Sequence, residues 1–157
     1  MTEVTNYKQL AQNVAVLLDK DDKPKKFQEE ALDEMRQVFT LASKSFKQKD
    51  FEKALTHYTF LVTHDPANAG FLLGLAECLY EIGNILDARI FFMFANKLDP
   101  QTFLAMRVAS CCVEIHQHAM AKEWFQKVLD QGIAEVDAEL ITIAATALKI
   151  YKKVSYE

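Results

Sequence analysis

Residues 71–100 read FLLGLAECLYEIGNILDARIFFMFANKLDP, and residues 37–66 read QVFTLASKSFKQKDFEKALTHYTFLVTHDP. The two stretches carry small, aromatic and Pro residues at the same places when one is shifted by 34. Ala54, Tyr58 and Pro66 recur in this way as Ala88, Phe92 and Pro100. A fixed period of about 34 residues is typical of helical hairpins that stack side by side. The sequence therefore predicts a tandem repeat of helix-turn-helix units.

A third copy follows the first two. Val38, Leu41 and Ala42 recur as Leu72, Leu75 and Ala76, and at the same offset again as Met106, Ala109 and Ser110. The second half of this copy returns one residue early, because Ala121 and Phe125 follow Ala88 and Phe92 by 33. We expect a one-residue deletion in the turn between the two helices of the third hairpin.

Each copy has apolar residues at helical spacing and a small residue where its two helices approach each other. Asp-Pro pairs at 65–66 and 99–100 separate the hairpins, since Pro disfavours helix in the residue before it and suits a first helical turn. The expected helices cover residues 5–18, 30–48, 51–63, 69–82, 85–98, 102–116, 118–130 and 135–152. The predicted fold is all-α, with three tandem tetratricopeptide-like hairpins, an N-terminal helix and a C-terminal capping helix. Residues 1–26 form the N-terminal helix and a charged linker, and residues 27–157 form the repeat domain.

The composition disfavours several classes of protein. The net charge of −4 and the scattered basic residues argue against nucleic-acid binding. The N-terminus has no signal-peptide pattern and no run of eighteen apolar residues occurs, so we expect a cytoplasmic protein without membrane insertion. Cys78, Cys111 and Cys112 are interpreted as free buried thiols, and His116 and His118 lack partners for a metal set. No catalytic motif is present, so no cofactor, no metal and no enzymatic activity are expected.

One face of the first helix of each hairpin should line a concave surface. Phe39, Ser43 and Phe46 form such a stripe, which continues one repeat later as Leu73, Glu77 and Tyr80 and then as Arg107, Cys111 and Glu114. The alternative is that the two Phe residues pack on the N-terminal helix. The expected peptide-binding residues are Phe39, Ser43, Phe46, Phe51, Leu73, Glu77, Tyr80 and Arg107. An extended peptide would place alternate side chains in apolar pockets, while Glu77 or Arg107 would hold its backbone or charges.

The N-terminal helix carries Tyr7, Leu10, Val14 and Leu17 on one face. This apolar face is larger than a free surface helix should show. It lies beyond the charged stretch at 19–26. We expect these four residues to mediate a homodimer.

The sequence resembles the class II chaperones of bacterial type III secretion systems, the SycD, LcrH and IpgC group, over most of its length. The stretch 38–46 with Phe51–Ala54 is similar to that family's first repeat, the stretch 71–78 with Gly83 and Ala88 to its second, and 121–125 to its third. The family usually has an aromatic residue where Ser43 stands and a Tyr or similar residue at Ile85. The resemblance implies a bacterial cytoplasmic chaperone that binds hydrophobic translocator proteins in a concave groove and keeps them soluble before export. It also implies a homodimer formed through the N-terminal helix.

A generic tetratricopeptide adaptor that docks a peptide motif in another complex remains the alternative. It would share the fold and recognise a different, more charged ligand. Co-purification with a membrane-inserting client would separate the two.

Overall fold

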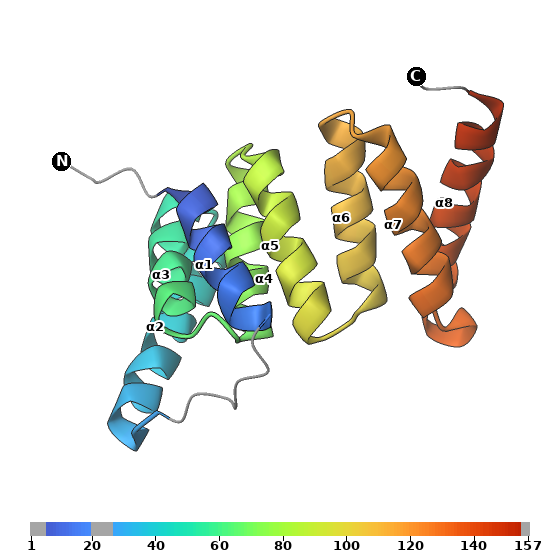
Figure 1. Cartoon of the computed structure of the whole chain (residues 1–157). Helices are drawn as coiled ribbons and strands as arrows, with labels where there is room; N and C mark the ends of the chain where they lie inside the picture. The colour runs from blue at the N-terminus through green and yellow to red at the C-terminus, as the bar shows by residue number, and fades with distance from the viewer. Residues whose placement is uncertain (1–5, 20–26, 155–157) are drawn as a thin grey trace.

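The computed structural model of the chain describes residues 6–19 and 27–154. All regular structure within these residues is helical, as predicted. The helices are α1 (Tyr7–Asp19), α2 (Glu29–Lys47), α3 (Phe51–His64), α4 (Ala69–Glu81), α5 (Ile85–Leu98), α6 (Thr102–Glu114), α7 (His118–Gln131) and α8 (Ala134–Lys153). Helices α2 to α7 form three antiparallel hairpins side by side, and α8 closes the far end (Figure 1).

Specific residues explain where the second helices of the hairpins begin and where the chain turns. The side chains of Asp50 and Asn84 each accept a hydrogen bond from a backbone amide in the first turn of α3 and α5, which satisfies an amide that has no partner inside the helix. The turn within each hairpin contains one residue in the left-handed region: Lys49 at φ 61°, Gly83 at φ 89° and His116 at φ 60°. Gly adopts this backbone conformation without a steric penalty.

The small and aromatic positions of the repeat lie where the sequence predicts. Ala54, Ala88 and Ala121 are fully buried between paired helices. The aromatic residues four positions later, Tyr58, Phe92 and Phe125, are also buried. The core of the stack therefore consists of these seams together with the inward faces of α4 and α6.

The predicted place of the one-residue deletion is wrong. Helix α4 begins at position 69 and ends at 81, whereas α6 begins at 102 and ends at 114, so the offset is already 33 where α6 begins. Ala67 and Asn68 stand between Pro66 and α4, whereas Gln101 alone stands between Pro100 and α6. The connection between the second and third hairpins is thus one residue shorter, and the turn inside the third hairpin is complete.

This correction moves the register of α6 by one residue. Ala105, Val108 and Ala109 are fully buried and occupy the places of Leu72, Leu75 and Ala76. The stripe that corresponds to Leu73, Glu77 and Tyr80 is therefore Met106, Ser110 and Val113. Cys111 is fully buried, so it cannot line a groove as we expected.

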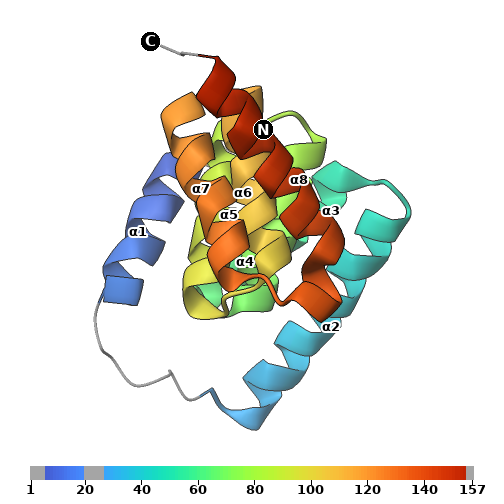
Figure 2. The same ribbon diagram turned by 90° about the vertical axis from the view of Figure 1, so that its right-hand side faces the viewer.

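Helix α1 packs against the second helices of the first two hairpins. Its side chains Ala11 and Val14 are buried, the Tyr7 and Thr59 hydroxyls are 3.5 Å apart, and Lys97 Nζ lies 2.9 Å from Asp19 Oδ1. Figure 2 shows α1 and α2 at opposite edges of the stack. Phe39 and Phe46 on α2 therefore do not pack on α1, and the alternative considered for them is excluded. Nearly all of the linker predicted at 19–26 lies outside the described residues.

Candidate functional site

Phe39 is the centre of an aromatic cluster on α2. Its ring lies 6.1 Å from the ring of Tyr58 in an edge-on arrangement and 5.6 Å from that of Phe71. Tyr58 and Phe71 are buried, but 38% of Phe39 remains exposed. Aromatic rings bury a large apolar area when they are covered, so this exposed ring is an anchor point for a ligand.

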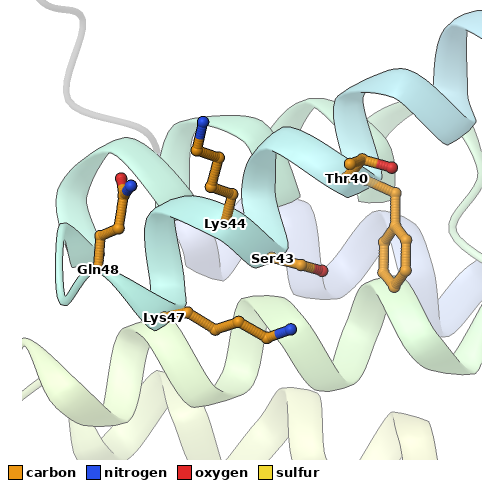
Figure 3. Close-up of a pocket in the computed structure, with 6 residues that line it drawn as sticks. Thr40, Ser43, Lys44, Lys47 and Gln48 are labelled. Atoms are coloured by element: carbon orange, nitrogen blue, oxygen red, sulfur yellow. The ribbon is translucent and has the colours of Figure 1, made fainter.

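Two hollows meet at Phe39. The first, of about 500 Å³, is lined by Phe39, Thr40, Ser43, Lys44, Lys47 and Gln48 (Figure 3). The second, of about 230 Å³, is lined by Leu32, Met35, Arg36, Phe39, Asp65, Asn68 and Phe71. An apolar side chain could contact Phe39 from either hollow. The basic groups of Lys44, Lys47 and Arg36 would then lie near the ligand backbone or its acidic side chains.

Ser43 has a defined role beneath the first hollow. Its hydroxyl lies 3.3 Å from the Tyr58 hydroxyl, within hydrogen-bond distance. Burial raises the pKa of Tyr58, and the hydrogen bond to Ser43 acts in the opposite direction. The small side chain of Ser43 thus satisfies a buried phenol and leaves space above it.

Phe46 and Phe51 line neither of the two hollows. Their rings are 5.2 Å apart in an edge-on arrangement, at the end of α2 and the start of α3. Both are half-buried. Their mutual contact holds the turn of the first hairpin, and whether either also touches a ligand stays a prediction.

A polar network joins α4 to α6. Arg107 Nη2 is 2.6 Å from Glu77 Oε2, and its guanidinium lies over the rings of Tyr80 and Phe92, at 4.2 Å and 4.9 Å. The Tyr80 hydroxyl donates a hydrogen bond to Glu114, and this bond raises the pKa of Tyr80, with burial acting in the same direction. Glu77 and Arg107 are partly exposed. A ligand along the face formed by α2, α4 and α6 would therefore lie close to their charges.

The structure thus places seven of the eight predicted peptide-binding residues in three groups. Phe39 and Ser43 line the larger hollow, Phe46 and Phe51 contact each other, and Glu77, Tyr80 and Arg107 form the network. Leu73, the remaining predicted residue, lies on α4 and is half-buried. Sequence reasoning missed Lys44, Lys47 and Phe71. Phe71 belongs to the repeated stretch, but the two Lys residues look like ordinary solvated positions of an amphipathic helix.

The four residues predicted to form a dimer interface differ in their exposure. Val14 is fully buried, and Tyr7 and Leu10 are half-buried against the core of the same chain. Leu17 is 45% exposed, and the neighbouring Val16 is 56% exposed. In this conformation a partner copy can therefore reach only the outer edge of the predicted face.

The three thiols are buried and free, as predicted. Burial raises the pKa of Cys78 and of Cys111 to about 12, and burial also raises the pKa of Cys112. These groups are therefore neutral and inert at physiological pH. Across residues 6–19 and 27–154, no helix is long and apolar enough to cross a membrane, and no cluster of His, Cys, Asp and Glu could hold a metal ion.

The repeat geometry defines a tetratricopeptide-type helical fold, and the family model for the tetratricopeptide repeat matches residues 45–105. Among solved structures, the chain is similar to the Yersinia enterocolitica type III secretion chaperone SycD in complex with a peptide of the translocator YopD. That similarity has a TM-score of 0.71 at 20% identity and covers 80% of this chain and 97% of SycD. The predicted resemblance to translocator chaperones is confirmed at the level of the fold.

Two further structures show the breadth of this fold. PcrH in complex with the chaperone binding region of PopD has a TM-score of 0.68 at 18% identity and covers 81% of this chain and 95% of PcrH. The complex of the TPR2B domain of yeast Sti1 with pHsp70 has a TM-score of 0.63 at 19% identity and covers 73% of this chain and 96% of that domain. No curated protein sequence matches the chain.

Proposed function

We propose that this protein is a bacterial cytoplasmic chaperone of type III secretion, which binds an extended segment of a hydrophobic translocator protein and keeps that client soluble until export. The observation that carries the proposal is the exposed ring of Phe39 between two hollows on α2. The fold supports it, because SycD and PcrH share this architecture and their structures hold translocator segments.

An extended peptide suits this site for a geometric reason. Alternate side chains of an extended chain point the same way and lie about 6.6–6.8 Å apart, so two of them can enter neighbouring hollows. Burial of one Leu-sized side chain contributes roughly 1.5–3 kcal/mol. Two such anchors, less the free energy needed to order the peptide, give reversible binding, which export of the client requires.

Polar groups along the site would fix the direction of the peptide. Lys44 and Lys47 line the larger hollow, and the Glu77–Arg107 pair joins the first helices of the second and third hairpins. Charged groups at the rim of a binding site mainly affect association rate and specificity. The apolar anchors therefore provide the affinity, and these charges select the register.

A generic tetratricopeptide adaptor is the second candidate, and one observation favours it. Lys44 and Lys47 both line the larger hollow, and their side chains point to different sides of α2 (Figure 3), so each ammonium group could separately attract an acidic ligand. The similarity to the Sti1 domain shows that the fold occurs outside secretion.

The test is calorimetric titration of two peptides into three proteins. One peptide is an apolar segment from a candidate translocator, and the other is a short acidic peptide with a free C-terminus. The proteins are the wild type, Phe39→Ala and the Lys44→Ala/Lys47→Ala double variant. The chaperone proposal expects the apolar peptide to bind, with most of its affinity lost in Phe39→Ala and little dependence on salt. Preferential binding of the acidic peptide, lost in the double Lys variant and at high salt, would favour the adaptor.

Co-expression gives a second measurement in the cell. A translocator that aggregates alone should stay soluble and co-purify with the wild-type chaperone. Phe39→Ala should return much of the client to the insoluble fraction. A client that remains equally soluble with either protein would contradict the role of this site.

A further inference from the structure

The outer face of α8 is unusual for the end of a repeat stack. Terminal helices of such stacks normally present a polar face to solvent, since no further repeat covers them. In α8, Ile143 is 48% exposed and Ile150 is 53% exposed. The opposite face packs inward through the fully buried Ala144 and through Tyr151, whose hydroxyl lies 3.1 Å from His118 Nδ1. The exposed Ile residues are therefore additional to those that cap the stack.

These two residues belong to a regular stripe. The exposed residues along it are Glu139, Ile143, Thr146, Ile150 and Lys153. Successive members are four, three, four and three positions apart, a spacing that keeps them on one face of a helix. The stripe lies beyond Asp137, where the backbone of α8 departs from helical geometry, so it occupies one continuous helical segment.

The stripe presents the same series of residue types when it is read from either end, except that the acidic and basic ends exchange places. Read from the N-terminus it is acid, Ile, Thr, Ile, base, and read from the C-terminus it is base, Ile, Thr, Ile, acid. When two copies of α8 lie antiparallel about a two-fold axis at Thr146, Ile143 of each copy lies within one residue, about 1.5 Å along the helix, of the place opposite Ile150 of the other, so the two Ile side chains can pack together. Glu139 of each copy then faces Lys153 of the other. A surface that matches itself in this way is what a two-fold symmetric dimer requires.

We propose that the outer face of α8 is a self-association surface whose partner is a second copy of this chain, paired antiparallel through the stripe from Glu139 to Lys153. Steps of four and three residues are those of a coiled-coil seam, in which apolar residues interlock and flanking charges set orientation. Within the described residues, Glu139 and Lys153 make no ion pair, so both charges are available. Thr146 donates to the Thr142 carbonyl oxygen at 2.9 Å, so its hydroxyl can approach the axis with its donor already satisfied.

The charge pattern distinguishes this partner from others. A lipid surface or an apolar client would gain nothing from an acid and a base placed at equal distances from the centre. From its first member to its last, the stripe runs along about 21 Å of helix. Contact over one helix pair is smaller than a standard stable interface, so the dimer should be reversible and depend on concentration.

This surface is separate from the other two discussed above. Figure 1 shows α8 at the far end of the stack from α2 and from α1. Substitutions on α8 should therefore leave peptide binding at Phe39 unchanged. They should also act independently of Leu17 on α1.

The test measures the dimer dissociation constant of the full-length chain by sedimentation velocity at low salt. Ile150→Glu should weaken the dimer by at least about tenfold, and so should either single charge reversal, Glu139→Lys or Lys153→Glu. Lys152→Glu is the matched control, because it makes the same charge change at an exposed neighbour outside the stripe. It should stay within about threefold of the wild type. Thermal melts confirm that each variant is folded.

Two combinations of the charge reversals make the test specific to antiparallel pairing. The double variant Glu139→Lys/Lys153→Glu restores opposite charges at both contacts and should recover the dimer. A mixture of the two single variants should also dimerise. In that mixed dimer the introduced Lys of one chain faces the introduced Glu of the other, and the two unchanged residues face each other as in the wild type.

The outcomes that overturn the proposal are specific. If the folded single variants keep the wild-type mass, or if neither combination recovers the dimer, the proposal is wrong. Loss of client binding in Ile150→Glu with an unchanged mass would assign the face to the client and would also overturn it.

Discussion

Tyr58 of α3 packs its ring directly against the backbone of Gly74 in α4, where an added Cβ would lie 2.1 Å from Cε1 of the ring. The third hairpin has an analogous contact with different chemistry. There Arg107 occupies the place of Gly74, and its guanidinium lies over Phe92, which occupies the place of Tyr58. One position of the repeat is thus used for close packing in one hairpin and for a charged contact in the next.

Gly74→Ala should destabilise the protein by about 1–3 kcal/mol, because the new methyl group overpacks the contact with Tyr58. The free energy of unfolding from urea titration measures this. Gly70→Ala is the control in the same helix, where the nearest atom to an added Cβ is Asn68 Oδ1 at 3.3 Å. It should change stability by less than about 1 kcal/mol. Equal effects of the two substitutions would contradict the close contact.

Ala88→Leu should cost about 1–3 kcal/mol of stability, since Ala88 is fully buried at the seam of the second hairpin. Thermal and urea unfolding would both report the loss. Leu86→Ala, two residues away at a position that is 52% exposed, should be close to neutral. A melting temperature for Ala88→Leu within a degree of the wild type would mean that the seam accommodates a larger side chain.

Phe39→Ala should weaken binding of an apolar client peptide by about 2 kcal/mol or more, as substitution of an aromatic anchor does. Stability should fall by roughly 1–3 kcal/mol, less than for a fully buried ring, because Phe39 packs on Tyr58 and Phe71 and is 38% exposed. Phe46→Ala is the informative comparison, since Phe46 contacts Phe51 and lies outside both hollows. Calorimetric titration and a melt, run together on each variant, distinguish a lost anchor from a lost packing contact.

Tyr80→Ala and Glu77→Lys test the network between α4 and α6. Both should reduce client binding, the first by removing an aromatic surface and the second by reversing a charge beside the ligand. Glu77→Lys also places a second cation beside Arg107, where the paired oxygen lies 2.6 Å away in the wild type. The side chains are partly exposed, so the stability cost should stay near about 1 kcal/mol or below. Unchanged binding in both variants would remove the network from the ligand site.

The buried thiols predict a loss of stability at alkaline pH. The pKa of Cys78 and of Cys111 rises from 9.0 to about 12 on folding, mainly because of burial. Between these values the unfolded chain binds fewer protons than the folded one, so the free energy of unfolding falls as pH rises from 9 towards 12. Below pH 9 both states are protonated and the full contribution is present. The Cys78→Ala/Cys111→Ala variant should show a shallower decline over this range, and an identical slope would contradict the assignment.

The repeat made most of the fold predictable. Small residues at 54, 88 and 121 and aromatic residues four positions later recur with a regular period, and both sets are buried as that period predicts. The deletion was misplaced because Ala109 fits the repeat at an offset of either 33 or 34. The apolar pattern alone does not choose between the two, since Ala109 replaces Leu75 at an offset of 34 and Ala76 at an offset of 33. The shorter connection at Gln101 settles it.

The site was less predictable than the fold. Periodicity assigns a residue to a face, but it does not say whether a neighbour covers that face. Phe46 and Phe51 fall on plausible inward positions, and the period does not show that their rings contact each other. Val14 similarly belongs to an apolar face that the sequence leaves without a partner, and the structure covers it with the chain's own α5. Contacts that the helical period does not encode decide both cases: a ring at the start of the next helix for Phe46, and a helix distant in sequence for Val14.

The docking of α1 has a consequence for how the newly made chain behaves. Most helices pack on the next one along the chain, but α1 must wait for α5, and the Asp19–Lys97 contact joins residues 78 positions apart. At a synthesis rate of about 5–20 residues per second, roughly 4–16 s pass between the translation of these two partners. During that interval the face that carries Val14 has no α5 to cover it. In a protein proposed to shield the apolar segments of others, the N-terminal helix therefore emerges from the ribosome with its own apolar face uncovered until α5 has been made.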